Sequence, residues 1–468
     1  MTEDRGSRVG VLDDRHRALT AGILLSVGMV AFESLGVATV LPVIARDLDG
    51  LAAYGWGLSA LMLANIMGTV VAGHMADRRG VSRPLMIGML VFLAGCVIAG
   101  AVGSWPLFLV GRVVQGIGVG AVMAASYTVI GRAYPEVLRG QMFALLSSAW
   151  TIPSLVGPLL AGLAADLVGW RWVFVAMVPL IVAAMALTLP RLRRMTDAGP
   201  GRAETASDGG VRWWRGPLAS SLLLTLGTAL LLQALLFGNL ALTAAGVIVG
   251  LLVALSSFRR VTPEGTLSAR PGLGAGVIVR LLLSGAYFGS EAFLPLAFQE
   301  LRGQTPAAAG LALSAGALTW VAGSLLQARW DRRHQGRRRS RAVAMGAIIL
   351  LLGTLTIAVT ALVDAVPAWI AIAGWAVGGL GMGIAFNAST TDTMEQAAEG
   401  QQGQVSSALQ LAQTLATALV AGIGGAIVAS ATGAADRLPA TIATVFAVTA
   451  ALAAIAIVLA GRLRPAAR

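Results

Sequence analysis

The sequence contains no lysine, a single cysteine and only three histidines among its 468 residues. One cysteine, Cys96, excludes an intrachain disulfide, and His16, His74 and His334 are spaced too widely to predict a metal site. Charged residues make up 12% of the chain, roughly half of the share of about 25% that soluble domains carry. This scarcity of charge excludes a soluble multidomain enzyme, a disordered chain and a disulfide-rich secreted scaffold.

Apolar residues make up 57% of the chain, and the mean hydropathy is +0.79. A helix needs about 20 apolar residues to span a membrane, and the apolar runs predict an all-α polytopic membrane protein of about fourteen spans. The first run, 18–41, is too long for the core of a signal peptide, so we expect a retained span. The predicted order is a tail (1–17), a six-helix half (18–190), a polar linker (191–216), a two-helix hairpin (217–258), a loop (259–272), a second six-helix half (273–462) and a tail (463–468).

Arginine supplies all of the positive charge, and its distribution tests this topology. With fourteen spans both termini lie on one side, and most of the 34 arginines fall on that side. The loops of the other side hold only Arg46, Arg171, Arg302 and Arg437. Cytoplasmic loops carry the excess of basic residues. We therefore expect a protein of the cell membrane with both termini in the cytoplasm. The net charge of +12 is therefore explained by the orientation of the chain in the membrane. We expect the lipid bilayer as a partner and no nucleic acid.

The two six-helix halves resemble each other in the same direction of the chain. Four short matches occur in the same order in both halves. Two parallel halves of this kind imply a transporter with a central site between them, the hairpin being an addition outside the repeat. The matches are Leu41-Pro42 with Leu294-Pro295, Asp77-Arg78-Arg79 with Asp331-Arg332-Arg333, Gly116, Gly118 and Gly120 with Gly379, Gly381 and Gly383, and Arg139-Gly140-Gln141 with Gln402-Gly403-Gln404.

The loop after the second predicted span resembles the signature loop G-x-L-A-D-R-x-G-R-K of the major facilitator superfamily. The resemblance extends over about 18–462 and implies the two-half transporter fold of that family. It also implies that the loop aspartate makes a contact between the halves in the outward-open state. The loop keeps Gly73, Asp77, Arg78, Gly80 and Arg83, and it departs at Val81 and Ser82, where basic residues are usual.

Two further stretches are similar to motifs of that family. The fourth span resembles a motif whose intramembrane arginine, here Arg112, is implicated in proton coupling. The fifth resembles the antiporter motif G-x-x-x-G-P-x-x-G-G, which the second half lacks, and this asymmetry is typical of its fourteen-span drug/proton antiporters. The residues that match are Gly157, Pro158 and Gly162, while Pro153 and Ala161 replace two of the glycines.

Ionisable residues inside a span are expensive and indicate function. At 1.5 Å per residue, Glu33 and Arg112 lie at a similar depth, roughly 10–14 Å below the outer surface, on helices that share one half in the resembling fold. We therefore expect them to pair, directly or through Gln115. Burial favours a neutral carboxyl and a nearby guanidinium favours a charged one. The pair is either a proton-exchange site or a fixed ion pair that joins two helices.

The second half carries Glu291 and Arg280 within its first span. Glu291 either binds a cationic substrate or reaches the outer water. Arg280, near the inner end, either extends to the inner water, which we expect, or is a site residue. Other polar or aromatic side chains within spans are candidates for the substrate cavity, although each could equally serve packing. They are Asn65, Tyr127, Trp150, Tyr287, Trp320, Asn387, Gln410 and Gln413.

Together these features predict a monomeric proton-coupled exporter of small amphipathic or lipophilic compounds, some of them cationic. The proton is the coupling ion, and no other cofactor and no metal is expected. The chain has no Walker-type phosphate loop, which excludes that route to ATP. A lipid or metabolite exporter is the alternative within transport. A nutrient symporter is disfavoured by Gly157-Pro158, and an integral-membrane enzyme or sensor by the linker 191–216, which has no histidine or cysteine.

Overall fold

The computed structural model describes residues 11, 13, 16–196, 216–398, 401–431 and 435–463. Most of the predicted tails (1–17 and 463–468) and of the linker (191–216) lies outside these residues. The first half comprises α1 (Arg17–Asp47), η1 (Leu51–Ala53), α2 (Trp56–Arg79), α3 (Ser82–Ala101), α4 (Trp105–Ala133), α5 (Glu136–Leu167), α6 (Arg171–Val175) and α7 (Met177–Thr196). The hairpin is α8 (Pro217–Ala234) and α9 (Leu240–Val261). The second half comprises α10 (Leu273–Arg302), α11 (Pro306–His334), α12 (Arg339–Leu362), α13 (Trp369–Glu395), α14 (Gln402–Ala429), η3 (Ala435–Arg437), α15 (Leu438–Leu459) and η4 (Ala460–Leu463).

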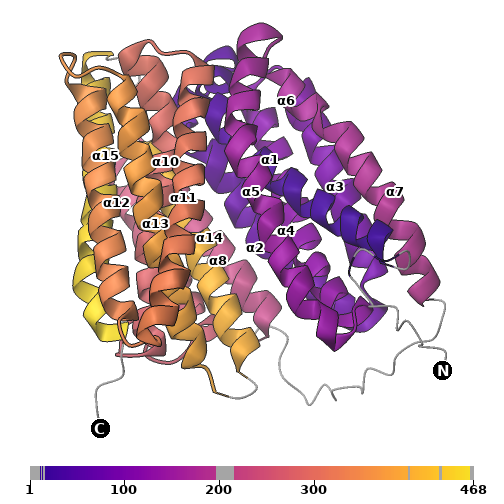
Figure 1. Cartoon of the computed structure of the whole chain (residues 1–468). Coiled ribbons are helices and arrows are strands. Elements are labelled where there is room, and N and C mark those ends of the chain that lie inside the picture. The colour runs from indigo at the N-terminus through magenta and orange to yellow at the C-terminus, as the bar shows by residue number, and fades with distance from the viewer. Residues whose placement is uncertain are drawn as a thin grey trace, which may run out of the picture.

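The helices account for fourteen membrane crossings. Thirteen segments of the described chain are long and apolar enough to span a membrane, with α6 and α7 forming one of them, and α8 contributes a shorter apolar helix, Leu218–Ala234. The even number leaves the start of α1 and the end of α15 at the same end of the molecule (Figure 1). We call this the terminal end and the opposite one the far end. The chain is thus an integral, multi-pass, all-helical membrane protein.

Local sequence sets the ends of several helices. Asn239 caps α9, because its Oδ1 accepts hydrogen bonds from the amides of Ala241 and Leu242 at 2.9 and 3.1 Å. Thr305 caps α11 through a 3.2 Å bond from the Ala308 amide. Gly303 ends α10 in the left-handed region with φ of 58°, which glycine adopts without strain.

Glycines of α4 bring its backbone against two neighbours. A Cβ atom on Gly116 would lie 2.3 Å from the Leu61 carbonyl oxygen of α2, and one on Gly120 would lie 2.2 Å from that of Asn65. On the other face, a Cβ on Gly118 would lie 2.4 Å from the Phe92 amide nitrogen of α3. Only glycine permits this backbone approach.

The second half repeats this packing with the matching glycines of α13. A Cβ on Gly379 would lie 2.0 Å from the Gly316 carbonyl oxygen of α11, and one on Gly383 would lie 2.1 Å from that of Trp320. A Cβ on Gly381 would lie 2.5 Å from the Gly346 carbonyl oxygen of α12. The glycine repeat of the sequence is therefore a repeat of helix contacts, and the two-half architecture is confirmed.

The two halves lie together at the far end and diverge toward the terminal end (Figure 1). At the far end the Tyr54 hydroxyl donates to the Ala292 carbonyl at 3.0 Å, and the Ser59 hydroxyl donates to the Ala418 carbonyl at 2.8 Å. An ion pair joins Arg46 Nε to Glu300 Oε1 at 3.3 Å. These contacts close the far end of the molecule.

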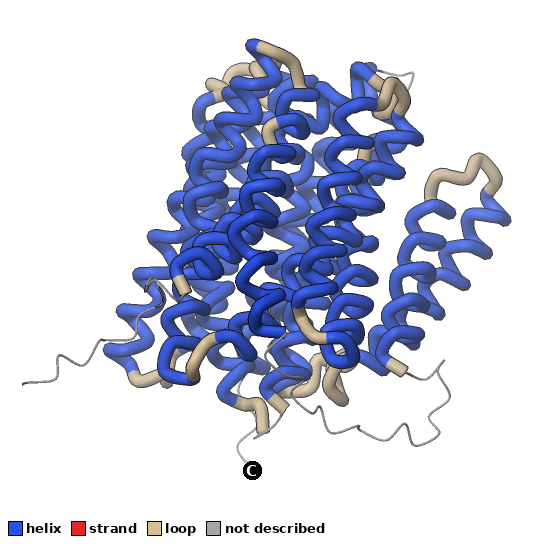
Figure 2. The backbone as a smooth tube through the Cα atoms, turned by 90° about the vertical axis from the view of Figure 1, so that its right-hand side faces the viewer, coloured by secondary structure: helices blue, strands red, loops and turns tan. Residues whose placement is uncertain are grey.

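The hairpin packs at the junction of the halves, where α2 and α14 meet. Leu231 and Leu232 of α8 cluster with Leu63 and Ile66 of α2 and with Ala418 of α14. Only 17% of the most apolar stretch of α9 is buried, against 83% of the corresponding stretch of α10. Figure 2 shows the hairpin at the side of the bundle, so α9 faces the lipid and α8 separates it from the halves.

The glycine contacts predict the effect of adding one methyl group. Gly383→Ala places a Cβ against the Trp320 carbonyl, and Gly120→Ala places its counterpart against that of Asn65. Each change should lower the free energy of unfolding by about 1–3 kcal/mol, as overpacking does. Thermal unfolding of the purified protein in detergent measures the effect.

Gly131→Ala in α4 is the matched control, because nothing lies within 4 Å of its Cβ. It should be neutral or stabilising by up to about 1 kcal/mol, since alanine favours a helix. Equal loss in all three variants would show that the close approach of the helices is not what these glycines provide.

Candidate functional site

A buried ion pair joins α1 to α4 within the first half. The Arg112 guanidinium donates through Nη1 to Glu33 Oε1, and both side chains are almost completely inaccessible to solvent. The α4 glycines draw that helix toward α2 and α3. The predicted contact between Glu33 and Arg112 is therefore present and direct.

Three more groups hold the Arg112 guanidinium in place. Its Nη1 also donates to Gln115 Oε1 at 2.9 Å, and its Nε donates to the Gly57 carbonyl of α2 at 2.8 Å. Gln115 in turn donates to Cys96 Sγ at 3.3 Å. Among the described residues Glu33 Oε2 and Arg112 Nη2 have no hydrogen-bond partner. One carboxylate oxygen thus binds the guanidinium, while the other accepts no hydrogen bond from the described residues.

The pair is connected to the contact between the halves through the first turn of α2. Arg112 holds this turn at Gly57, and the residues before Gly57 face the second half. A Cβ on Gly55 would lie 2.3 Å from the Ala421 carbonyl oxygen of α14, and Tyr54 donates to the carbonyl of Ala292 on α10. The Glu33–Arg112 pair is therefore connected by hydrogen bonds to a segment that contacts the second half.

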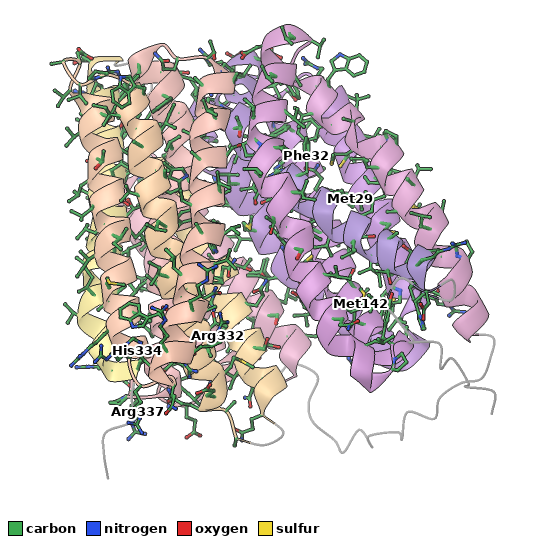
Figure 3. The ribbon with its side chains drawn as sticks, viewed as in Figure 1. Met29, Phe32, Met142, Arg332, His334 and Arg337 are labelled. Carbon is green, nitrogen blue, oxygen red and sulfur yellow. The ribbon has the colours of Figure 1, made fainter. Side chains whose placement is uncertain are left out.

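The motif of the fifth span lies on both sides of α5. Gly157 faces α1, where a Cβ would lie 3.3 Å from the Phe32 ring, and Figure 3 labels Phe32 on α1 one residue before Glu33. Gly162 faces the second half, where a Cβ would lie 2.5 Å from the Pro306 carbonyl oxygen. Pro153 and Pro158 both lie inside the helix. The motif therefore packs α5 against α1 and against α11.

In the second half Glu291 is largely buried, at 7% exposed, and its two predicted roles, binding a cationic substrate and reaching the outer water, stay predictions. α10 is enclosed on most sides, and no hydrogen bond or ion pair to Glu291 occurs among the described residues. The expectation that Arg280 extends to water is wrong, because it is 3% exposed. Its Nη2 donates to Thr390 Oγ1, and α13 covers it.

The remaining cavity candidates divide by exposure. Tyr127 and Trp150 are 48% and 37% exposed, and Gln410 is also exposed. Asn65, Trp320, Asn387 and Gln413 are partly buried, and Gln115 and Tyr287 are buried. Asn65 Oδ1 accepts a hydrogen bond from Thr69 at 3.1 Å. Buried Gln115 and Tyr287 therefore do not line an open surface in this conformation.

The signature loop lies at the terminal end. Nothing is within 4 Å of a Cβ on Gly73 or Gly80; Gly80 ends α2 with φ of 76° and Arg83 is exposed. The side chains of Asp77 and Arg78 lie outside the described part of the structure. The corresponding residue of the second half, Asp331, binds Arg339 through two 2.8 Å bonds.

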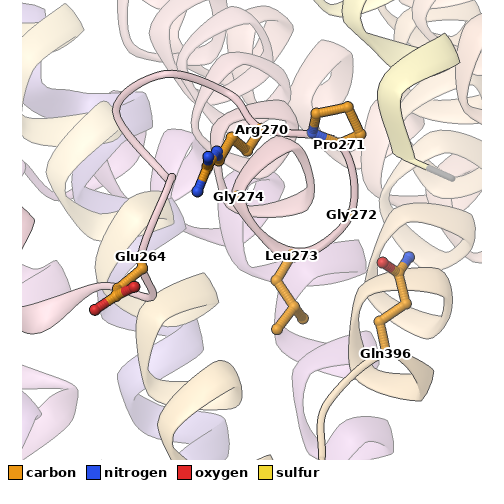
Figure 4. A pocket seen from close by; sticks show the side chains of 7 residues that line it. All are labelled: Glu264, Arg270, Pro271, Gly272, Leu273, Gly274 and Gln396. Atoms are coloured by element: carbon orange, nitrogen blue, oxygen red, sulfur yellow. The ribbon is translucent and has the colours of Figure 1, made fainter. Parts of the chain in front are cut away.

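The hollow in Figure 4 is separate from these charged groups. It has a volume of about 410 Å³ and is lined by the loop before α10, including Glu264 and Arg270, and by Gln396, which directly follows α13. None of the buried charged residues lines it. It belongs to the connection between the hairpin and the second half.

Sequence reasoning missed the groups that receive the charged residues. Gly57 binds Arg112 through its carbonyl, which no side-chain pattern reveals. Thr390 and the Phe386 ring bind Arg280. They lie one turn apart on α13, on either side of the predicted cavity residue Asn387, and this position could have indicated their role. Tyr54 was also missed, although the chain has only four tyrosines.

Residues 23–421 match the family model of the Major Facilitator Superfamily. The chain is 27% identical over 401 residues to a probable multidrug-efflux transporter of Mycobacterium tuberculosis, covering 84% of this chain and 83% of that protein. It is 31% identical over 159 residues to multidrug resistance protein 3 of Bacillus subtilis, covering 34% of this chain and 31% of that one.

Solved transporters share the fold at low sequence identity. The POT family transporter PepTSo superposes with a TM-score of 0.68 at 14% identity, covering 95% of this chain and 97% of that one. A D-xylose–proton symporter superposes with a TM-score of 0.67 at 14% identity, covering 96% and 98%. These relatives and structures are transporters, which confirms the prediction that the chain is not an enzyme.

The buried pair predicts a double-mutant cycle. Arg112→Gln leaves Glu33 without its buried counter-ion and should lower the free energy of unfolding by about 3–5 kcal/mol at neutral pH. Adding Glu33→Gln should restore a large part of that loss, because no buried charge then remains unpaired. Thermal unfolding in detergent of the two single variants and the double variant measures the coupling.

Arg171→Gln is the control, because Arg171 pairs with Asp47 at 3.1 Å while both side chains are about half exposed. Its cost should be about 0–1 kcal/mol. If the losses of Arg112→Gln and Glu33→Gln simply added in the double variant, Glu33 and Arg112 would not interact energetically.

Proposed function

The chain belongs to the Major Facilitator Superfamily, and from that premise we propose that it exports small amphipathic or lipophilic compounds in exchange for protons. The observation that carries the proposal is the Glu33–Arg112 pair, buried and connected through Gly57 to the contact between the halves. The multidrug-efflux relatives support the substrate class. We place both termini in the cytoplasm of the cell, on the positive-inside distribution of arginine, and expect a monomer.

With that orientation, the closed far end and the divergent terminal end correspond to an inward-facing conformation (Figure 1). Substrate enters from the cytoplasmic side while Glu33 is ionised and paired with Arg112. After the halves rock to face outward, a proton from outside binds Glu33 and favours substrate release. Return to the inward state then lets Glu33 lose its proton to the cytoplasm and pair again.

Neutralising Glu33 leaves Arg112 with only neutral acceptors, namely the Gly57 carbonyl and Gln115. A charge without a counter-ion is costly in the membrane interior. Protonation therefore favours a movement of Arg112, and with it of the first turn of α2. That turn contacts the second half through Tyr54 and Ser59. This provides a physical connection between the proton and the closure of the far end.

The available energy is sufficient for efflux. One proton moving down one pH unit supplies about 1.4 kcal/mol, and a potential of 100 mV adds about 2.3 kcal/mol per charge. Together these support a roughly 500-fold gradient of a neutral substrate exchanged for one proton. The energetics require no hydrolysis of ATP.

Glu33→Gln tests the coupling in reconstituted vesicles with an imposed pH gradient and ethidium as the transported dye. Wild type should move the dye against the concentration gradient of the dye. The variant should lose transport driven by the pH gradient, because the amide cannot exchange a proton. Asp364→Asn is the control, since the Asp364 side chain is 99% exposed. It should transport like wild type. Gradient-driven transport that persists in Glu33→Gln would restrict Glu33 to a structural role.

A cross-link between positions 46 and 300 tests alternating access. Arg46 and Glu300 face each other across the halves at the far end, and the only native cysteine, Cys96, is buried. Arg46→Cys/Glu300→Cys treated with a short thiol cross-linker should lose transport, and a reductant that cleaves the linker should restore it. Each single-cysteine variant should transport after the same treatment. Full transport by the cross-linked protein would exclude opening of this contact from the cycle.

A further inference from the structure

Arg280 is a buried cation that no carboxylate of the described residues pairs with. It is the eighth residue of α10 and is 3% exposed. Its Nη2 donates to Thr390, and its guanidinium lies over the Phe386 ring at 3.5 Å from the centroid. In the described part of the chain its Nε has no hydrogen-bond partner and it forms no ion pair with a carboxylate. Among the described residues its acceptors are a hydroxyl and an aromatic face.

The two other buried arginines of the described chain have carboxylate partners. Arg112 pairs with Glu33, and Arg339 pairs with Asp331 and Glu395. A buried charge without a partner is costly, and the negative face of a phenyl ring compensates it only in part. A carboxylate from outside the protein would complete the guanidinium with parallel hydrogen bonds, the geometry for which arginine is suited.

Aromatic side chains extend from Arg280 along the second half. The Phe386 ring lies 5.1 Å from that of Trp320, which in turn lies 5.9 Å from Phe288 and 4.9 Å from Tyr287, between ring centroids. Phe386, Trp320 and Phe288 are partly exposed, so this surface is accessible while Arg280 lies behind it. A planar apolar body can pack on these rings while an acidic group reaches the guanidinium.

We propose that Arg280 and Thr390 form the subsite for an anionic group, a carboxylate, of an aromatic amphipathic substrate whose ring system packs on Trp320 and Phe386. The carboxylate takes the place of the Phe386 face against the guanidinium, while the Thr390 hydroxyl, which donates to the Phe386 carbonyl at 2.6 Å, holds Nη2 of Arg280 in place as its acceptor. This inference rests on the proposed transport function and adds a substrate class to it. The accepted compounds then include aromatic acids as well as the cations for which Glu291 is suited.

The test is binding to the full-length protein in detergent without any pH gradient. The probes are anthracene-2-carboxylate and anthracene-2-carboxamide, which have the same shape and differ in the charge of one group. Equilibrium dialysis at pH 7 should give wild type an affinity for the acid about 10- to 100-fold higher than for the amide, as expected for a hydrogen-bonded charged group. Arg280→Gln should reduce this ratio to about 1, while Arg280→Lys should keep part of it.

Arg341→Gln is the matched control, because Arg341 is an exposed arginine of α12. It removes the same charge and should leave the ratio unchanged. Equal binding of acid and amide by wild type, or an undiminished ratio in Arg280→Gln, would overturn the proposal. Because no proton gradient is used, a failure of proton-driven efflux with an intact, Arg280-dependent ratio would overturn the transport mechanism and leave this subsite standing.

Discussion

Direct contact between helix backbones is the constraint on which the rest of this structure depends. Lipid tails are as apolar as leucine, so the hydrophobic effect does not press helices together in a membrane, and close packing must do so. Gly116, Gly118 and Gly120 bring α4 against α2 and α3. The same contacts recur around α13. At the far end Gly55 and Gly425 bring the two halves together, with 2.4 Å between the Gly55 backbone and a Cβ built on Gly425.

This packing decides which charges can be buried. Because α4 lies so close to α2, Arg112 reaches the Gly57 carbonyl as well as Glu33. The same arrangement in the second half places Arg280 against α13, where it meets Phe386 and Thr390 and no carboxylate. The repeat therefore produces two halves of similar fold and different electrostatics. In the first half Glu33 and Arg112 form an ion pair between two helices. In the second half Arg280 and Glu291 lie apart on the single helix α10.

The asymmetry gives the proposed transport cycle its parts. In that proposed cycle the proton acts on a pair whose guanidinium also binds the first turn of α2, next to the contact between the halves. The second half, with its partly exposed aromatic surface, is suited to hold substrate. The hairpin packs on α2 and α14 and so covers one side of the junction between the halves. Proton and substrate would then act on the same contact from opposite sides.

The sequence by itself determined the class of this protein. Fourteen apolar runs, arginine concentrated on one side and a repeated glycine pattern specify a two-half membrane transporter, because span length and backbone packing are local requirements. The pairing of Glu33 with Arg112 followed from their matching depth together with the resembling fold, which places their helices in one half. Only the tertiary structure decided what surrounds each charge. Arg280 and Glu291 stand at ordinary positions in an apolar run, and their burial depends on how closely α13 and the other helices pack on α10. The Gly57 carbonyl accepts a hydrogen bond from Arg112, and the Tyr54 hydroxyl donates one to the Ala292 carbonyl. The side-chain sequence does not encode such contacts, because every residue carries a carbonyl and the fold selects which one is used.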